Sequence, residues 1–389
     1  MNRLEPFEYH SDTRVLFGQG CIAQLGDAVR RLSSGPVLLV TDPGIVAAGL
    51  AARALASLDS AELQVEVFDG VEENPTTLHV QAGVQFVSRT GVEFGSIVGL
   101  GGGSAMDCAK GINFLLTNGG RMEDYWGDGK ATTAMLPSIG VPTTAGTGSE
   151  AQRFTLIAQD QGEHQKMACG DCKVRFRTVL LDPDLLSTAP AAVVAAAAVD
   201  AVAHAVESFV TTRANPVSRL FAGEALRLLH GSFESWVGNH QSNDTGGAVL
   251  LGAHWAGAAI EHSMLGAAHA CANPLTGRYG ITHGVAVGVM LPHVIRYNGT
   301  VVNGDYANLV KVAGIAVEVE ESAAADVLAD RVGALYRSAR MPSRLSELPG
   351  VKEEELESLA QRAASQMTAG FNPRAVGRDE CHQLYRAAF

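Results

Sequence analysis

A buried strand that leads directly into three glycines, and from there into a helix, constrains the fold of this chain more than any other feature. Residues 96–100 form a short apolar run, Gly101, Gly102 and Gly103 follow it, and residues 104–110 continue with helical spacing. Glycines let the backbone approach a ligand closely, and the N–H groups at the start of a helix bind anions. The run differs from the G-x-G-x-x-G fingerprint, yet it predicts a pyrophosphate contact. The alternative is a tight strand–helix turn without a ligand.

The first half of the chain repeats this alternation of apolar strand and helix, which is typical of an α/β fold with a parallel sheet. Strands are expected at residues 37–40, 63–68, 96–100 and 136–141, with helices at 46–58 and 78–89. A strand pair is expected from residues 154–158 and 174–181, with Lys166 between them.

The second half of the chain shows helical spacing and few β-branched runs. Helices are expected at about 190–209, 216–236, 246–260, 284–297, 303–314, 321–338, 352–366 and 378–387. The change of pattern predicts two domains, an α/β domain at residues 1–187 and an all-α domain at residues 188–389.

Charge and cysteine usage narrow the class of protein. The 389 residues carry a net charge of −12 and no cluster of Lys and Arg, which argues against nucleic acid or an anionic membrane as a partner. The N-terminus lacks the apolar segment of a signal peptide, and the apolar run at residues 189–199 is too short to span a bilayer. Six dispersed cysteines favour reduced thiols, so we expect a cytoplasmic protein.

Two further loops in the first half have nucleotide-binding character. Asp42 follows the strand at 37–40, where a carboxylate accepts hydrogen bonds from ribose hydroxyls and repels a 2′-phosphate. Residues 142–149 follow the strand at 136–141 and offer hydroxyls and glycines without bulky side chains. The alternative for both loops is a turn that ends in a helix N-cap.

A carboxylate and three imidazoles in the second half suggest a metal site. Asp200 and His204 are four residues apart in an expected helix, so both leave the same face. His269 and His283 lie in a Gly-rich apolar region further along the chain. Such a ligand set suits Fe2+ or Zn2+. The alternative is a buried Asp–His pair in a core helix.

Taken in order, these motifs resemble the iron-containing (group III) alcohol dehydrogenases along essentially the whole chain. The matching segments are Gly101-Gly102-Gly103-Ser104 with Asp107 and Lys110, residues 142–150, Leu181-Asp182-Pro183, Asp200-Ala201 with His204 and Glu207, His269 with Asn273-Pro274, and His283-Gly284. Several specific motifs in the family's order carry more weight than any one alone.

The resemblance implies a fold similar to that of dehydroquinate synthase, with an N-terminal NAD-binding α/β domain and a C-terminal helical metal-binding domain. It implies Asp200, His204, His269 and His283 as the metal ligands, with Fe2+ as the ion and Zn2+ as the alternative. The residues at positions that contact NAD in the family are Asp42, Asn74, Gly101, Gly102, Gly103, Ser104, Asp107, Thr143, Thr144, Thr147, Ser149, Phe154, Lys166 and Leu185. A homodimer or larger homo-oligomer is also expected.

One position departs from the family's pattern. Many relatives carry a second histidine four residues after the third ligand, and this chain has Asn273 there. An amide does not shuttle protons at neutral pH, although it forms hydrogen bonds with a substrate. His254 and His262 are candidates for the missing relay, and the alternative is that both are ordinary helix histidines.

The function expected from the resemblance is a metal-dependent alcohol dehydrogenase or aldehyde reductase. Hydride would pass between NAD(H) and a small primary alcohol or aldehyde held at the metal. No arginine stands within the motifs as a clamp for a carboxylate, which favours a neutral substrate. The alternatives are a zinc-dependent polyol dehydrogenase, a metal-independent reductase similar to maleylacetate reductases, and an NAD-binding protein without catalytic activity.

Overall fold

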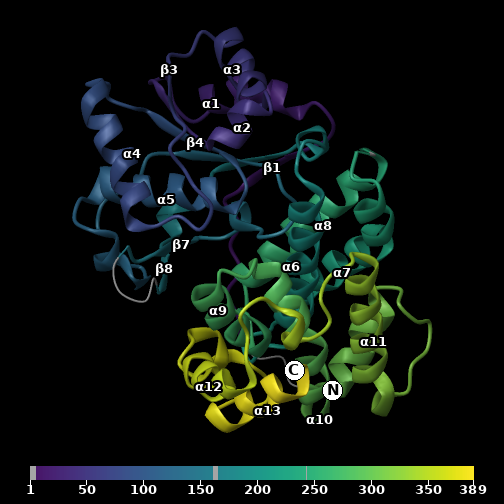
Figure 1. Cartoon of the computed structure of the whole chain (residues 1–389). Helices are drawn as coiled ribbons and strands as arrows, with labels where there is room; N and C mark the ends of the chain where they lie inside the picture. Colours follow the sequence, from purple (N-terminus) through teal and green to yellow (C-terminus); the bar gives the residue numbers. More distant parts are fainter. Residues whose placement is uncertain (1–5, 161–164, 242) are drawn as a thin grey trace. The chain divides into compact units, whose positions relative to one another are not determined.

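The computed structural model describes residues 6–160, 165–241 and 243–389, without the side chains of residues 243 and 244 (Figure 1). The described chain divides into two compact units. One is Ser11–Ala189, and the other combines residues 6–10 with Pro190–Phe389. Residues 6–10 therefore belong to the helical unit, although they precede the α/β unit in sequence.

A six-stranded parallel sheet forms the centre of the α/β unit. Its strands are β1 (Arg14–Phe17), β2 (Val37–Val40), β3 (Val65–Phe68), β4 (Ser96–Gly101), β6 (Ser138–Pro142) and β9 (Thr178–Leu181). The order across the sheet is β1-β9-β6-β4-β2-β3, and every neighbouring pair is parallel. Every residue of β2, β4, β6 and β9 is buried, as expected where helices cover both faces.

Helices cover the two faces of this sheet with separate apolar clusters. They are α1 (Leu25–Arg30), α2 (Pro43–Ala47), α3 (Leu50–Ser60), α4 (Thr77–Thr90) and α5 (Gly103–Asn118). Leu38 of β2 packs in the cluster that contains Val80 of α4 and Ile112 of α5. Its neighbour Leu39 packs in the opposite cluster with Leu58 of α3. Successive strand side chains point to opposite faces, so an apolar run without alternation fits this two-sided burial.

The expected strand pair at residues 154–158 and 174–181 is wrong. Strand β7 (Phe154–Ala158) pairs antiparallel with β8 (Lys166–Gly170), and β5 (Gly127–Asp128) completes a small sheet in the order β5-β8-β7. Residues 178–181 form β9, which lies between β1 and β6 in the large sheet. Their burial at every position fits a central strand, whereas the first residues of β8 alternate between partly and fully buried.

The helical unit is assembled around α6 (Ala191–Val210), which is buried at every residue from Ala198 to Val210. Around it lie α7 (Pro216–Gly238), α8 (Asn243–Glu261), α9 (Ala267–Tyr279), α10 (His283–Val312), α11 (Ala324–Ser338), α12 (Leu356–Ala364) and α13 (Arg378–Ala388). Helices α7, α8 and α10 all contact α6. The many alanines of α6 allow these helices to pack closely around it.

Glycine and proline explain where the expected helices and the observed ones differ. Helix α9 was not expected, because Pro274 lies inside it. The helix expected at 46–58 is two helices, which meet at Gly49 with φ 76°. The two helices expected at 284–297 and 303–314 correspond to the two parts of α10, which meet at a kink at Val302.

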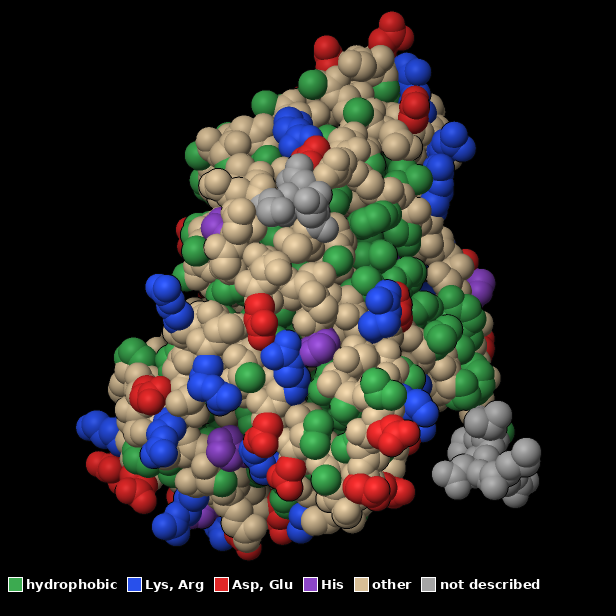
Figure 2. Space-filling view, turned by 90° about the vertical axis from the view of Figure 1, so that its right-hand side faces the viewer, with side chains coloured by type: hydrophobic (Ala, Val, Ile, Leu, Met, Phe, Trp, Pro, Cys, Tyr) green, Lys and Arg blue, Asp and Glu red, His purple; other side chains and the backbone are tan. Residues whose placement is uncertain are grey.

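The surface charges and the burial of the apolar helices are relevant to the expectation that neither nucleic acid nor a membrane is a partner. On the face shown in Figure 2, Lys and Arg side chains are interspersed with carboxylates. In the helical unit, exposed Arg296 pairs with Asp326 and Asp330. Helices α6 and α10 are long and apolar enough to cross a membrane, but 89% of the apolar window of α6 is buried inside the protein. That degree of burial is typical of a core helix.

Candidate metal and nucleotide sites

Helix α6 presents Asp200 to three imidazoles. The Nε2 atoms of His269, His204 and His283 lie 3.4, 3.5 and 3.9 Å from Asp200 Oδ1. Ligand atoms of Asp200, His269 and His283 all lie within 4.8 Å of one another. His204 is outside that group of three, but its ring stacks on that of His269 with centroids 4.8 Å apart. The structure thus brings together all four residues that the sequence analysis singled out.

The burial and charge of this group fit a bound cation. Asp200 and His269 are 5% and 3% exposed, and neither Asp200 Oδ1 nor His269 Nε2 has a hydrogen-bond partner among the described residues. Orphaned polar atoms in the interior are costly, and a divalent ion would satisfy both. Burial by itself raises the pKa of Asp200, but the three neighbouring imidazoles, His204 foremost, outweigh it and lower the pKa well below its usual range.

Glu207 orients the His269 ring through the nitrogen that does not face Asp200. Its Oε2 lies 2.5 Å from His269 Nδ1, and its Oε1 accepts a hydrogen bond from the N–H of Ala268 at 2.7 Å. Burial lowers the pKa of His269, but Glu207 and then Asp200 outweigh this and raise it to about 9. A carboxylate at Nδ1 keeps a proton on that nitrogen, so Nε2 is the nitrogen at which a cation would replace a proton. The sequence analysis quoted Glu207 in a motif but gave it no role, although it shares the helix face of Asp200 and His204.

His283 lies at the accessible side of the group. Its side chain is 27% exposed, against 7% for Asp200 and 4% for His269. Thr276 Oγ1 lies 3.4 Å from His283 Nδ1. The next residue, Gly284, allows α10 to approach α6, because a Cβ at this position would lie 2.0 Å from the carbonyl oxygen of Ala196. The site is therefore closed around Asp200 and open near His283.

In the α/β unit, the glycine turn lies at the carboxyl ends of adjacent strands. Gly101 has φ 148°, and a Cβ there would lie 2.7 Å from the Cβ of Ala105 and 3.2 Å from Asp42 Oδ2. Asp42 Oδ1 accepts from the N–H of Ile45, so this residue is also the N-cap of α2. Gly103 likewise approaches the side chain of Thr147. Asp42 and the two predicted loops thus meet at one edge of the parallel sheet, where α/β proteins bind nucleotides.

A buried Asp–Lys pair holds the second of these loops. Asp107 Oδ1 accepts from the hydroxyl of Ser149 at 2.5 Å, and Oδ2 accepts from the N–H of Leu156. Lys110 Nζ donates to the carbonyls of Ser149 and Phe154, both at 2.7 Å. Burial raises the pKa of Asp107 although Lys110 and Ser149 oppose the shift. Helix α5 is thereby fixed to the segment that follows the loop.

Comparison with known proteins decides the family. The model for "Iron-containing alcohol dehydrogenase" matches residues 12–183, and the model for "Fe-containing alcohol dehydrogenase family, C-terminal" matches residues 194–389. The chain belongs to the iron-containing alcohol dehydrogenase family. It is 34% identical to alcohol dehydrogenase 4 of Schizosaccharomyces pombe over 96% of this chain and 87% of that protein. It is 32% identical to lactaldehyde reductase of Escherichia coli, over 96% and 97% of the two chains.

Solved structures of the family share the fold. A 1,3-propanediol oxidoreductase, 32% identical, superposes with a TM-score of 0.94 and covers 99% of this chain and 100% of its own. A sulfoacetaldehyde reductase from Bifidobacterium kashiwanohense in complex with NAD+ is 25% identical and has a TM-score of 0.87, with 99% of each chain covered. The predicted combination of a parallel α/β domain and a helical domain is confirmed.

His254 and His262 were candidates for the proton relay that Asn273 cannot provide. Both lie elsewhere in the helical unit. His262 packs against Tyr9, with ring centroids 4.8 Å apart, and against Phe221. His254 is buried beside Trp255. Neither belongs to the group of Asp200, His269 and His283. Asn273 itself donates to Gln366 Oε1 at 3.1 Å.

The remaining expected cofactor contacts are spread over the α/β unit. Thr143 donates its N–H to the carbonyl of Gly101 at 2.9 Å, so the two loops are joined. Asn74 has a left-handed backbone with φ 53°. Leu185 is fully buried in the apolar cluster of α3, and Lys166 begins β8. Ser104 lies in the first turn of α5, and a Cβ on Gly102 would meet Thr144 Oγ1 at 3.4 Å.

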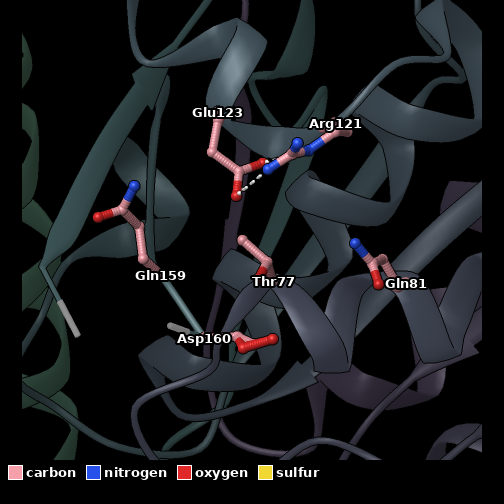
Figure 3. Close-up of a pocket in the computed structure, with 6 residues that line it drawn as sticks. All are labelled: Thr77, Gln81, Arg121, Glu123, Gln159 and Asp160. Atoms are coloured by element: carbon pink, nitrogen blue, oxygen red, sulfur yellow. Dashed lines mark hydrogen bonds and ion pairs between the residues drawn. The ribbon is translucent and has the colours of Figure 1, made fainter. Parts of the chain in front are cut away.

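The α/β unit also contains a polar pocket of about 470 Å³ (Figure 3). It is lined by Thr77, Gln81, Arg121, Glu123, Gln159 and Asp160. Arg121 and Glu123 form an ion pair at 3.0 Å. No expected cofactor contact is among the lining residues, so this pocket is separate from the glycine turn.

Proposed function

We propose that this chain is a metal-dependent alcohol dehydrogenase that transfers hydride between NAD(H) and a small primary alcohol or aldehyde. The observation that carries the proposal is the convergence of three imidazole Nε2 atoms on Asp200 Oδ1, with the open side at His283. An enclosed ligand set with one accessible side is the arrangement of a catalytic rather than a structural metal site. Membership of the family supports the same reaction.

We assign Asp200, His204, His269 and His283 as the metal ligands, with Fe2+ as the ion and Zn2+ as the alternative. The ion would act as a Lewis acid on the substrate oxygen. The protein contributes orientation, because Glu207 fixes the ring of His269 and Thr276 contacts that of His283. A complete ligand set argues against a metal-independent reductase and against an NAD-binding protein without catalytic activity.

The Glu207→Gln variant should bind the metal about 10- to 100-fold more weakly and lose activity in proportion. A neutral amide holds the imidazolyl proton less strongly, so Nε2 of His269 becomes a poorer ligand. Titration of metal into chelator-treated protein measures the change. Glu224→Gln is a suitable control, because Glu224 forms a pair with Arg227 on the exposed side of α7. Wild-type affinity in Glu207→Gln would remove the role assigned to Glu207.

We assign the cofactor to the edge of the sheet where the glycine turn, Asp42 and Thr147 meet. The start of α5 would receive the pyrophosphate, and Asp42 would accept from the adenosine ribose. NAD accepts or supplies the hydride. A carboxylate at Asp42 disfavours a 2′-phosphate, so NAD is preferred over NADP. The solved relative with NAD+ supports the choice of cofactor.

The Asp42→Ser variant should lose roughly 10- to 100-fold of the preference for NAD over NADP, the value of one hydrogen bond to a charged group. Serine retains the N-cap of α2 that Asp42 provides, so stability should change little. The ratio of kcat/KM with the two cofactors measures the effect. An unchanged ratio would mean that Asp42 acts only as a helix cap.

The decisive test of the function follows NADH absorbance with a panel of aldehydes and alcohols, using protein loaded with Fe2+ or Zn2+. We expect turnover of small primary substrates, and faster turnover with NAD(H) than with NADP(H). Metal analysis of protein purified without added metal separates an iron enzyme from a zinc polyol dehydrogenase. No turnover with either metal would favour a protein that binds NAD without catalysis.

We further propose a cytoplasmic homodimer or larger homo-oligomer without nucleic acid or membrane partners. The described cysteines form no disulfide, and all but Cys172 are buried, which fits a reducing compartment. On the face shown in Figure 2, Lys and Arg side chains are interspersed with carboxylates, and a polyanion binds to a cluster of like positive charges. Light scattering on the purified protein would give the oligomeric state directly.

A further inference from the structure

An amide pair lies next to the candidate metal site, and the reaction described above does not use it. Asn273 follows His269 by one turn of α9, so the two side chains share a face, with Cβ atoms roughly 5–6 Å apart. Unlike His269, Asn273 is only partly buried. Its side chain therefore lies beside the third ligand at a position that solvent reaches.

A chain of hydrogen bonds fixes how this amide is turned. The carbonyl of Arg362 accepts from Gln366 Nε2 at 3.3 Å, and Gln366 Oε1 accepts from Asn273 Nδ2 at 3.1 Å. A backbone carbonyl only accepts, so Gln366 must turn its NH2 group toward α12 and its oxygen toward Asn273. Asn273 must then direct its NH2 group at Gln366.

This series of hydrogen bonds ends at the side-chain oxygen of Asn273, which is an acceptor. Among the described residues, no hydrogen bond ends on Asn273 Oδ1. An imidazole at this position would donate or accept according to its tautomer, whereas this amide oxygen only accepts. The Asn273 oxygen, one helical turn from His269, is thus fixed as an acceptor and requires an O–H or N–H donor.

We propose that Asn273 Oδ1 accepts a hydrogen bond from a second hydroxyl of the substrate, and that the enzyme therefore prefers diols and hydroxyaldehydes to plain alcohols and aldehydes of equal length. The inference rests on the proposed function, which places the reacting oxygen at the metal. An aldehyde with a carboxylate in place of that hydroxyl is disfavoured, because two acceptors would face one another. Gln366 is a positioning residue that prevents rotation of the Asn273 amide.

The test compares kcat/KM for 2-hydroxypropanal with that for propanal, and for 1,2-propanediol with that for 1-propanol. Wild-type enzyme should favour the hydroxylated member of each pair. In Asn273→Leu, which is similar in size but forms no hydrogen bond, this preference should fall roughly three- to tenfold. The loss should fall mainly on the hydroxylated substrate, so that the ratio of the two kcat/KM values decreases while the metal content stays at the wild-type level.

Gln366→Met gives a second, independent variant. Release of the Asn273 amide lets it present either the oxygen or the NH2 group, so the preference should fall part of the way. Asn303→Leu is the matched control, since Asn303 is a partly buried helix asparagine that bonds to Ser322 and Ala325. The control should lower stability without changing the substrate ratio.

The possible outcomes distinguish a failure of the role proposed for Asn273 from a failure of the proposed dehydrogenase function. Equal losses on both members of a pair, or no preference in the wild type, would overturn the role of Asn273 and leave the dehydrogenase function intact. Turnover of neither member by metal-loaded wild type would remove the proposed function and this inference with it.

Discussion

The His269→Ala variant is expected to lose its metal and at least about 10³-fold of kcat/KM, while NAD binding persists. His269 Nε2 lies 3.4 Å from Asp200 Oδ1, and its ring stacks on that of His204, so its removal takes away one proposed ligand and the support of another. Lewis-acid activation contributes several kcal/mol to such a reaction, which sets the size of the loss. The glycine turn belongs to the other unit and keeps its structure.

Three measurements are needed to interpret this variant. Metal analysis gives the stoichiometry, NADH turnover gives the activity, and fluorescence titration gives the NAD affinity. His254→Ala is the matched control, because His254 is also 3% exposed but lies outside the group of Asp200, His269 and His283. A His269→Ala protein that kept wild-type metal content and chelator-sensitive turnover would show that the ligand assignment is wrong.

The part of the candidate metal site that lies within one helix could be predicted from the sequence, and the contacts between distant segments could not. Asp200 and His204 meet because helical periodicity places them one turn apart, and periodicity is visible in the sequence. The role of Glu207 depends on His269, 62 residues further on, which contacts it only after α9 has packed against α6. The contact between Glu207 and His269 could not be predicted, because α9, with its internal Pro274, was not among the expected helices.

In the α/β unit too, local features could be predicted from the sequence, whereas contacts between distant segments could not. The glycine turn was recognised because φ values above zero and close approach require glycine wherever the chain folds. The strand at 178–181 was assigned to the wrong partner, because its apolar run identifies a buried strand but not its neighbours. Asp107 and Ser149 stay predicted cofactor contacts, but the structure also shows them bonded to one another. A sequence motif does not separate a ligand contact from a residue that supports the loop.

The Lys110→Met variant is expected to destabilise the α/β unit by about 3–5 kcal/mol, the cost of leaving a buried charge without its partner. Lys110 is 1% exposed, and its Nζ lies 3.9 Å from Asp107 Oδ1. Methionine fills the volume, but it removes the main counter-charge of Asp107 and the hydrogen bonds that Nζ donates to the carbonyls of Ser149 and Phe154. Chemical denaturation followed by circular dichroism measures the loss. A change below about 0.5 kcal/mol, the usual size for a surface substitution, would contradict this account.

The pH dependence of stability and a second substitution distinguish the loss of the Asp107 counter-charge from a loss of packing around Lys110. Burial already raises the pKa of Asp107, and removal of Lys110 must raise it further. A group whose folded pKa lies above its unfolded value favours folding at pH below the unfolded pKa, and this stability is lost as the pH rises through the folded pKa. Lys110→Met should therefore be least stable relative to wild type at neutral pH and recover on acidification. Asp107→Asn in the same chain should restore part of the loss at neutral pH, because an amide needs no counter-charge and still accepts from Leu156. A deficit that stayed constant with pH and persisted in the double variant would point to lost packing around Lys110 instead.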